Sequence, residues 1–298
     1  MNGNGTIIAL RSGRMTLTAV PRCGGSLASW RLSTADGPVD LFRPASDRAL
    51  AGAFAPDMAC FPLVPFSNRI GGGRFVFQGR EVKLETDPGS PHRIHGHGWS
   101  SPWTVGAVTD NAVRMEFDHP ARDWPWSYRT VQTLALDDDG LTIALDLVNA
   151  SDSDMPAGLG LHPYFAKSPG SRVFADVRAV WDNDETILPR QRRALPAAWD
   201  FRHGVVMDGL ALDNGFTGWT GKAVLERPRE GLCITMLADG PFGHLIVYAP
   251  LGEPYLCLEP VTHMTDALNR QQEPDAGVIA LPPGERLRVT VRFLLSRL

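Results

Sequence analysis

Residues 287–293 read Leu-Arg-Val-Thr-Val-Arg-Phe, and this stretch indicates the fold class. Apolar side chains occupy every second position, and Arg or Thr lies between them. Because successive side chains of a strand point to opposite faces, this alternation predicts a strand with one buried face and one solvated face. A strand of this kind is typical of an antiparallel sheet.

The same period of two recurs further back along the chain. Residues 141–147 and 232–236 both alternate apolar with polar or small side chains, which predicts two more half-buried strands. Residues 75–84 predict a β-hairpin in which Gly79 supplies the turn dihedrals. Helical periodicity is scarce, and the prolines within residues 185–203 allow only a short helical turn there.

Many short strands separated by turns predict an all-β fold, specifically a large antiparallel β-sandwich. The sequence contains no linker, low-complexity stretch or internal repeat that would divide it. We therefore expect a single domain over residues 1–298.

The composition restricts the possible partners. The 298 residues are 43% hydrophobic and 21% charged, which is close to the globular average and predicts a sizeable core. The net charge is −4 and the pI is about 6.1, so no electrostatic attraction to nucleic acid or to an anionic membrane is expected. The charge balance favours a small, neutral partner.

The cysteines and the apolar runs indicate the compartment. Cys23, Cys60, Cys233 and Cys257 are scattered and form no Cys-x-x-Cys pair, so we expect reduced and mostly buried thiols. The apolar run at residues 7–10 is too short for a signal peptide, and no apolar stretch is long enough to span a bilayer. We expect a cytoplasmic protein.

Asn68 and Arg69 stand directly before Ile70 and a run of three glycines. An arginine beside an asparagine presents a fork of hydrogen-bond donors on a close-fitting turn. The alternative is an ordinary hairpin loop with a solvated arginine.

A segment with three histidines, His92, His95 and His97, ends at Trp99. Histidines near one face of a strand suit a metal ion as readily as a sugar. A cupin-like metal site, however, has an acidic ligand a few residues after its His-x-His pair, and this chain has none there. Trp99 and Trp103 suit stacking on the apolar face of a sugar ring, with a partly buried core as the alternative.

Three further ionisable residues stand out by their surroundings. His162 lies among apolar residues, where a core histidine is the simple alternative. Glu259 ends an apolar run before Pro260, which we take as the end of a strand, and a carboxylate there is costly unless it is paired or reaches a cleft. Asp213 lies just before Asn-Gly, where an Asx-type turn is the alternative.

Taken in order, these features resemble the aldose 1-epimerase family. The matching landmarks extend over most of the chain and are Asn68-Arg69-Ile70, His95-Gly96, residues 161–165, Asp213 with Phe216, and residues 258–260. The resemblance implies the large antiparallel sandwich that this family calls a supersandwich. It also implies an isomerase, a mutarotase that interconverts the α and β anomers of a free aldose.

The resemblance implies roles for individual residues. Glu259 would be the catalytic base and His162 the catalytic acid, while Arg69, His95 and Asp213 would bind hydroxyl groups. We add Asn68 and Trp99 to the candidate substrate-binding residues. Ring opening removes a proton from O1 while O5 receives one, so no cofactor and no metal is expected.

The geometry of the reaction sets one more expectation. O1 and O5 are both bonded to C1, and each catalytic group must come within hydrogen-bonding distance of its oxygen. We therefore expect the Glu259 carboxylate and the His162 imidazole to face each other across one cleft, separated by the width of the bound hemiacetal. An aromatic side chain such as Trp99 or Phe216 should lie nearby.

Three alternatives stay open at this stage. A hexose-6-phosphate 1-epimerase would use a basic cluster such as Arg190, Arg192 and Arg193 to hold the phosphate. A non-catalytic sugar-binding module of the same fold would need no acid and base. A glycoside hydrolase would place two carboxylates around the glycosidic oxygen. For the leading hypothesis the partner is a small-molecule aldose, and the chain is a monomer or homodimer; the preferred aldose is left open.

Overall fold

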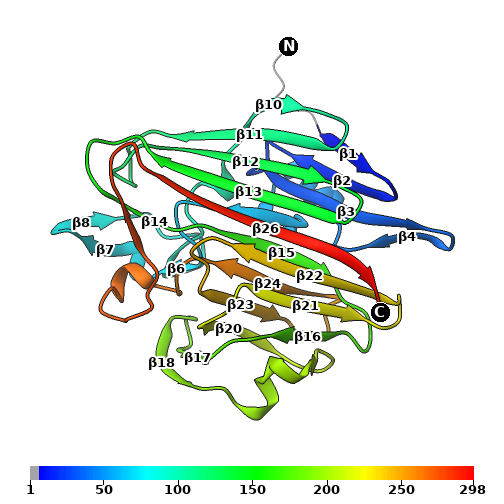
Figure 1. The fold of residues 1–298 in the computed structure, drawn as a ribbon. Helices are drawn as coiled ribbons and strands as arrows, with labels where there is room; N and C mark the ends of the chain where they lie inside the picture. Colours follow the sequence, from blue (N-terminus) through cyan, green and yellow to red (C-terminus); the bar gives the residue numbers. More distant parts are fainter. Residues whose placement is uncertain (1–6) are drawn as a thin grey trace.

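The computed structural model describes residues 7–298, and two large antiparallel sheets stack on each other within it (Figure 1). The first sheet has the strand order β1-β2-β3-β5-β15-β24-β23-β20-β17-β18, and β4 pairs with β3. Its strands are β1 (Ile8–Ser12), β2 (Met15–Val20), β3 (Ser26–Thr34), β4 (Gly37–Asp40), β5 (Cys60–Leu63), β15 (Gly160–Ala166), β17 (Ala179–Asn183), β18 (Pro189–Ala194), β20 (Leu212–Thr217), β23 (His244–Ala249) and β24 (Tyr255–Val261).

The second sheet has the order β10-β11-β12-β13-β26-β22-β21-β16-β19. Its strands are β10 (Thr104–Val108), β11 (Ala112–His119), β12 (Tyr128–Leu136), β13 (Gly140–Asn149), β16 (Arg172–Ala175), β19 (Val205–Val206), β21 (Lys222–Arg227), β22 (Leu232–Asp239) and β26 (Arg286–Arg297). The predicted all-β sandwich is therefore confirmed.

Smaller elements decorate the two sheets. Three two-stranded ribbons pair β6 (Arg69–Ile70) with β9 (Arg93–Ile94), β7 (Arg74–Phe77) with β8 (Arg80–Lys83), and β14 (Met155–Ala157) with β25 (Ile279–Leu281). The helical elements are α1 (Asp47–Gly52) and short 3₁₀ helices at Ala55–Asp57, Gly71–Gly73, Gly98–Ser100, Ala197–Trp199, Phe201–His203 and Ala267–Asn269.

The stretch at 287–293 lies within β26, where it has the predicted two faces. Its apolar side chains are buried, and its arginines are exposed. Phe293 reaches the first sheet, because its ring centroid lies 6.1 Å from that of Trp30 on β3 and 5.3 Å from that of Phe42. These aromatic contacts between the layers belong to the main hydrophobic core.

The other local predictions have mixed outcomes. The hairpin at residues 75–84 is confirmed as β7 and β8, and Gln78 and Gly79 both have positive φ, as a type I′ turn requires. Residues 185–203 contain β18 and two 3₁₀ helices. Helix α1, which the sequence did not predict, begins after Ser46, whose side chain accepts a hydrogen bond from the Ala49 amide at 3.1 Å.

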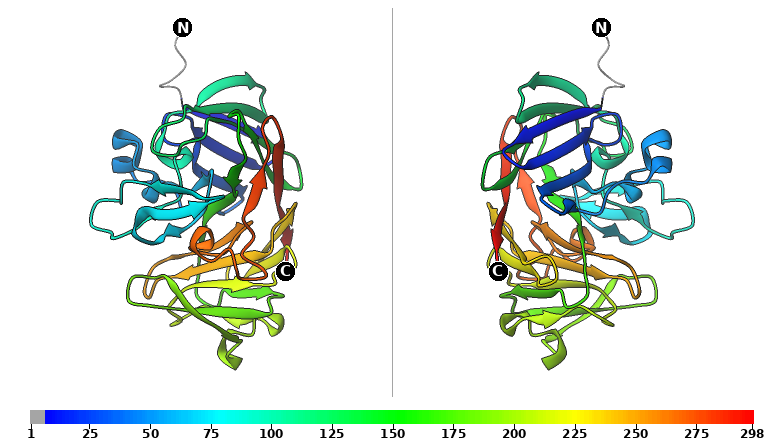
Figure 2. Two further views of the ribbon diagram at one scale, coloured as in Figure 1. Left: turned by 90° about the vertical axis from the view of Figure 1, so that its left-hand side faces the viewer. Right: turned by 90° about the vertical axis from the view of Figure 1, so that its right-hand side faces the viewer.

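Alternate residues of the central strands divide the first sheet into two faces. On β24, Leu256 and Leu258 pack into the core between the sheets, whereas Cys257 and Val261 belong to a second cluster on the outer face. That outer cluster also includes Met58, which follows α1 in the chain. In Figure 2 the blue-to-cyan segments that include α1 lie on the side of the first sheet that faces away from the second. Glu259 alternates with Leu258 in the same way as Cys257 and Val261 do, so its side chain lies on the outer face of the first sheet.

Three other expectations can be compared with the structure. All four thiols are free, three buried and one half-buried, as predicted. Within residues 7–298, no helix is both long enough and apolar enough to cross a bilayer. The assignment of one domain to residues 1–298 stays a prediction.

Candidate active site

A pocket of about 330 Å³ opens on the outer face of the first sheet. All seven candidate site residues line it, although the sequence separates them by up to 191 positions (Asn68 to Glu259). The lining consists of Pro56, Phe61, Asn68, Arg69, Ile94, His95, Trp99, His162, Tyr164, Asp213, Tyr248 and Glu259.

His162 and Glu259 come from the neighbouring central strands β15 and β24. The register pairs Gly160 with Val261 and Tyr164 with Cys257, which places His162 directly opposite Glu259. Their side chains meet, with 3.4 Å between His162 Nε2 and Glu259 Oε1. The two groups share one cleft as predicted, but the expected gap between them is wrong, because directly opposite residues of an antiparallel pair have Cβ atoms only about 5 Å apart.

Each of these two strands carries a proline next to its ionisable residue, Pro163 in β15 and Pro260 in β24. The backbone pairing of β15 with β24 is interrupted between Gly160 and Tyr164, because proline has no N–H to donate. The interpretation of Pro260 as a strand end is wrong, since β24 continues to Val261. Proline is rare in central strands, so the ladder is weakened at the two residues of interest.

Burial controls the ionisation of this pair. The Glu259 side chain is 3% exposed and that of His162 is 10% exposed. Burial raises the pKa of Glu259 well above its usual range, and Asp213 adds to this while Arg69 opposes it. Burial also lowers the pKa of His162 to about 3. Both shifts favour a neutral pair that holds one proton.

Two buried atoms of the pair have no hydrogen-bond partner among the described residues, namely Glu259 Oε2 and His162 Nδ1. A buried polar atom without a partner is costly and calls for an explanation. Because both residues line the pocket, a polar ligand could supply the missing hydrogen bonds.

Two aromatic rings pack against the His162 imidazole. The ring centroids of Phe61 and Tyr164 each lie 4.6 Å from that of His162 and 6.2 Å from each other, and the Tyr164 ring is stacked on the imidazole. The Arg43 guanidinium covers the far face of Tyr164 at 3.8 Å from the ring centroid, and it donates to the Pro56 and Met58 carbonyl oxygens. The sequence analysis missed Phe61 and Arg43, because nothing in their neighbourhoods distinguishes them from core and surface residues.

Asn68, Arg69 and His95 are arranged by the small ribbon of β6 and β9, in which Arg69 pairs with Ile94. The backbone N–H of Asn68 donates a hydrogen bond to His95 Nδ1 at 3.1 Å. The proton of the neutral His95 ring is therefore on Nε2. Asn68 Oδ1 accepts from Arg69 Nη1 at 3.3 Å. Burial, His162 and Arg69 lower the pKa of His95 well below its ordinary value. His95 is therefore a neutral donor.

Backbone conformation also marks this segment. Asn68 and His95 have φ values of 53° and 61°, which non-glycine residues adopt rarely. The following Gly96 lies so close to Val64 that an added Cβ would be 2.3 Å from the Val64 carbonyl oxygen. Gly96 thus allows the loop to pack closely against Val64 and Pro65, which follow β5, and this packing directs His95 into the pocket.

Asp213 and Trp99 complete the predicted set. Asp213 pairs with Tyr248 across β20 and β23, and burial raises the pKa of Asp213 while Arg69 lowers it. The Trp99 indole N–H donates to the Gly96 oxygen at 3.2 Å, and its ring lies 5.6 Å from that of Phe61. Tyr248 is a further lining residue that the sequence analysis did not single out.

Phe216 does not belong to the pocket. It is fully buried in the core between the sheets, where its ring centroid lies 5.3 Å from that of Phe201. Phe216 lies three positions after Asp213 on one strand, and an odd spacing puts two side chains on opposite faces. Of the two aromatic residues expected near the site, Trp99 lines the pocket and Phe216 does not.

The basic cluster also lies elsewhere. Arg192 and Arg193 on β18 form ion pairs with Asp275 at 3.4 Å and Asp182 at 2.6 Å. None of Arg190, Arg192 and Arg193 lines the pocket, in which Arg69 is the single cation among the lining residues. No phosphate-binding arrangement is therefore formed by that cluster at the pocket.

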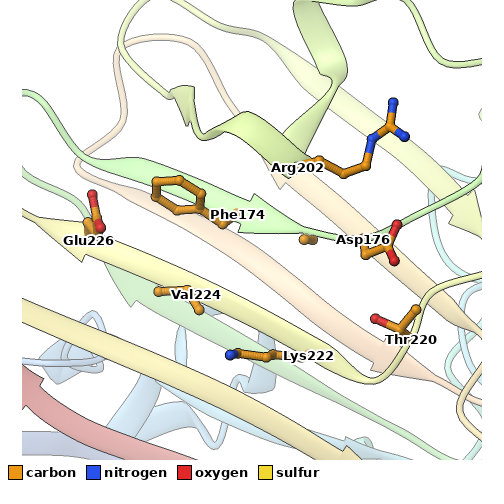
Figure 3. Close-up of a pocket in the computed structure, with 8 residues that line it drawn as sticks. Phe174, Asp176, Arg202, Thr220, Lys222, Val224 and Glu226 are labelled. Carbon is orange, nitrogen blue, oxygen red and sulfur yellow. The ribbon is translucent and has the colours of Figure 1, made fainter.

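A larger hollow of about 530 Å³ lies on the outer face of the second sheet, over β16 and β21 (Figure 3). Its charged side chains, which include Asp176, Lys222 and Glu226, are spread along the strands without converging on one point. Arg202, at its rim, is paired with Asp200 at 2.8 Å. The smaller pocket on the first sheet, in which the buried His162 and Glu259 side chains are in contact, is the better candidate site.

Two groups of side chains within the described residues have the spacing of metal ligands. One is His162, Cys257 and Glu259 in the pocket, and the other is His97, His119 and Asp123 outside it. The pocket group contains the His162 imidazole and the Glu259 carboxyl group, whose contact at 3.4 Å suits them to exchange a proton.

Comparisons with known proteins identify the family and the fold of the chain. The sequence model of the family described as aldose 1-epimerase matches residues 6–294. The uncharacterized Escherichia coli K12 protein YphB is 33% identical over 291 residues, covering 94% of this chain and 95% of YphB. A solved Escherichia coli K12 structure, provisionally described as an aldose 1-epimerase, has a TM-score of 0.90 at 31% identity and covers 98% of this chain and 99% of that chain. A galactose mutarotase-like protein from Clostridium acetobutylicum has the same fold, with a TM-score of 0.87 at 20% identity over 98% of this chain and 95% of that chain.

Proposed function

Since this chain belongs to the aldose 1-epimerase family, we propose that it is a mutarotase that interconverts the α and β anomers of a free, unphosphorylated aldose. The observation that carries the proposal is the contact between His162 and Glu259, at 3.4 Å, in a pocket whose other polar groups converge on the same space. A purely sugar-binding module would not need an acid and a base in contact.

The chemistry requires two coupled proton transfers. Opening of the hemiacetal removes the proton from O1, donates a proton to the ring oxygen O5 and breaks the C1–O5 bond. Rotation about C1–C2 then presents the other face of the aldehyde, and the reverse transfers close the ring. Glu259 acts as the base at O1 and His162 as the acid at O5, and each contributes about 10²–10⁴-fold in rate.

The protonation of the acid–base pair, by which we mean His162 and Glu259, fits this cycle. The neutral pair holds one proton, and so does the ionised pair that the reaction needs. The two forms differ only by transfer of that proton across the 3.4 Å contact. The sugar enters with O1 facing Glu259 and O5 facing His162, and it supplies hydrogen-bond partners to their unpartnered atoms.

The rest of the pocket supports recognition of a neutral sugar. Arg69, the neutral donor His95 and Asp213 offer charged and polar groups to hydroxyls, and Trp99 and Tyr248 offer ring faces. The separation of the β18 arginines from the pocket argues against a hexose 6-phosphate. The single Glu259–His162 pair also differs from the two carboxylates that a glycoside hydrolase uses.

Polarimetry on freshly dissolved α-anomers tests the proposal. The purified protein should accelerate the mutarotation of at least one of glucose, galactose, xylose and arabinose above the buffer rate. Glu259→Gln and His162→Asn should each lower kcat by roughly 10²–10⁴-fold, whereas the exposed controls Glu185→Gln and His203→Asn should behave as wild type. No acceleration on a broad sugar panel, or near-normal kcat in Glu259→Gln, would falsify the proposal.

A further inference from the structure

Outside the pocket, His97, His119 and Asp123 each place one potential ligand atom within 4.8 Å of the other two. His97 precedes the 3₁₀ helix at Gly98–Ser100, His119 ends β11, and Asp123 lies in the loop between β11 and β12. We propose that these three residues form a Zn²⁺-class metal site that has a structural role and is separate from the acid–base pair.

The ligand atoms are close to the spacing that zinc requires. Bonds of roughly 2.0–2.2 Å in a tetrahedral site leave ligand atoms about 3.3–3.5 Å apart. The distance between His97 Nε2 and Asp123 Oδ2 is 3.3 Å. The His119 ring stacks on the His97 ring with 4.2 Å between centroids, and its ligand atom lies within 4.8 Å of the other two, so the His119 side chain has to shift to bring its nitrogen to the same ion.

The surroundings provide the outer partners that metal-bound histidines usually have. The Tyr128 hydroxyl lies 3.4 Å from His97 Nδ1, which leaves Nε2 directed at Asp123. His119 Nε2 lies 3.4 Å from the Trp124 carbonyl oxygen, to which it can donate while Nδ1 keeps a lone pair. The Tyr128 ring also stacks on His119 at 4.8 Å, which fixes the ring plane.

Charge and exposure favour loading with a cation. Two neutral imidazoles and one carboxylate form a ligand set that suits Zn²⁺ and leaves a fourth position for water. The Asp123 side chain is 37% exposed, so an ion can enter from solvent. The positive charge of Arg93 opposes cation binding. Arg93 Nη1 lies 3.5 Å from Asp87 Oδ1, and the Asp87 carboxylate offsets part of the Arg93 charge.

The three ligands join segments that the pocket depends on. His97 lies in the chain between His95 and Trp99, both of which line the pocket. An ion bound by His97 and His119 would link this loop to β11 of the second sheet. The acidic partner that the sequence lacks after its His-x-His pair is supplied by Asp123, 26 residues further along.

Metal-free full-length protein, prepared with a chelator and dialysed, can be titrated with Zn²⁺ by calorimetry and with Co²⁺ by visible absorption. Wild type, His162→Asn and the exposed control His203→Gln should each bind one equivalent of Zn²⁺ outside the pocket. Asp123→Asn and His119→Gln should bind it at least tenfold more weakly. Added Zn²⁺ should raise the melting temperature of wild type and leave that of Asp123→Asn unchanged.

Asp123 is exposed and its amide replacement keeps the shape, so this variant should unfold like wild type in metal-free buffer. The proposal is overturned if wild type takes up no Zn²⁺, since the three residues then form only a hydrogen-bonded cluster. It is equally overturned if Asp123→Asn and His119→Gln bind as wild type, or if His162→Asn alone abolishes binding. None of these readouts depends on mutarotase activity.

Discussion

Replacing Glu259 by glutamine should raise the stability of the protein relative to wild type, increasingly so with rising pH. Glu259 is buried, and burial raises its pKa in the folded protein well above the ordinary value of 4.5. As pH rises above the unfolded-state pKa, the unfolded chain releases this proton while the folded protein retains it. The wild type thus loses stability as pH rises, until the raised pKa of folded Glu259 is reached.

The magnitude follows from linkage. Within that window the free energy of unfolding of the wild type falls by about 1.4 kcal/mol per pH unit relative to a variant that does not titrate at this position. Glutamine keeps the shape of the side chain and has no proton to lose. The other buried groups titrate in both proteins, so the difference between the two curves isolates Glu259.

Urea unfolding followed by tryptophan fluorescence at pH 5, 6, 7 and 8 gives the two curves. Glu185→Gln, which removes an exposed carboxylate, is the matched control and should show no such divergence from wild type. A wild type that instead gains stability over Glu259→Gln as pH rises would refute the reasoning. It would mean that His162 carries the shared proton in the resting protein and that Glu259 is ionised.

Three further outcomes are expected. The rate of mutarotation should fall as pH rises through the raised pKa of Glu259, because the acid–base pair then loses its only proton. It should also fall as pH drops to about 3, where His162 is protonated as well and the pair holds two protons. A rate that still climbs at high pH would contradict this assignment. Arg69→Ala, His95→Ala and Asp213→Ala should mainly raise KM, by roughly 10–100-fold for Arg69 and Asp213 and by less for the neutral His95. Steady-state kinetics that show only a kcat effect would count against binding roles. Activity should survive exhaustive chelation, even with the His97 site emptied; loss of turnover that added metal restores would assign the chemistry to an ion.

The sequence was sufficient for features that depend on local periodicity. The alternation at 287–293 predicted both faces of β26, and Gly79 predicted a hairpin turn. Ordered landmarks then brought Glu259, His162 and their neighbours into one predicted site. The structure places all seven candidate site residues around one pocket.

Features that depend on strand pairing over long sequence separations could not be predicted. The 3.4 Å contact between His162 and Glu259 results from the register of β15 on β24, which the whole sheet determines. The grouping of His97 with Asp123 similarly depends on where the loop after β11 ends. The position of Phe216, in contrast, could have been predicted from the sequence. Phe216 is three positions from Asp213 on one strand, and an odd spacing puts the two side chains on opposite faces of the sheet.

Several departures from good local structure lie at or beside the pocket. Pro163 and Pro260 occupy central strands, and Asn68 and His95 have left-handed backbone conformations. Each choice costs stability where an ordinary strand or loop residue would not. Because natural sequences are otherwise locally consistent, such conflicts gathered around one cavity are expected at a functional site. The large core between the sheets offsets them, which is why Glu259, whose burial raises its pKa well above the ordinary value, can stay buried beside His162.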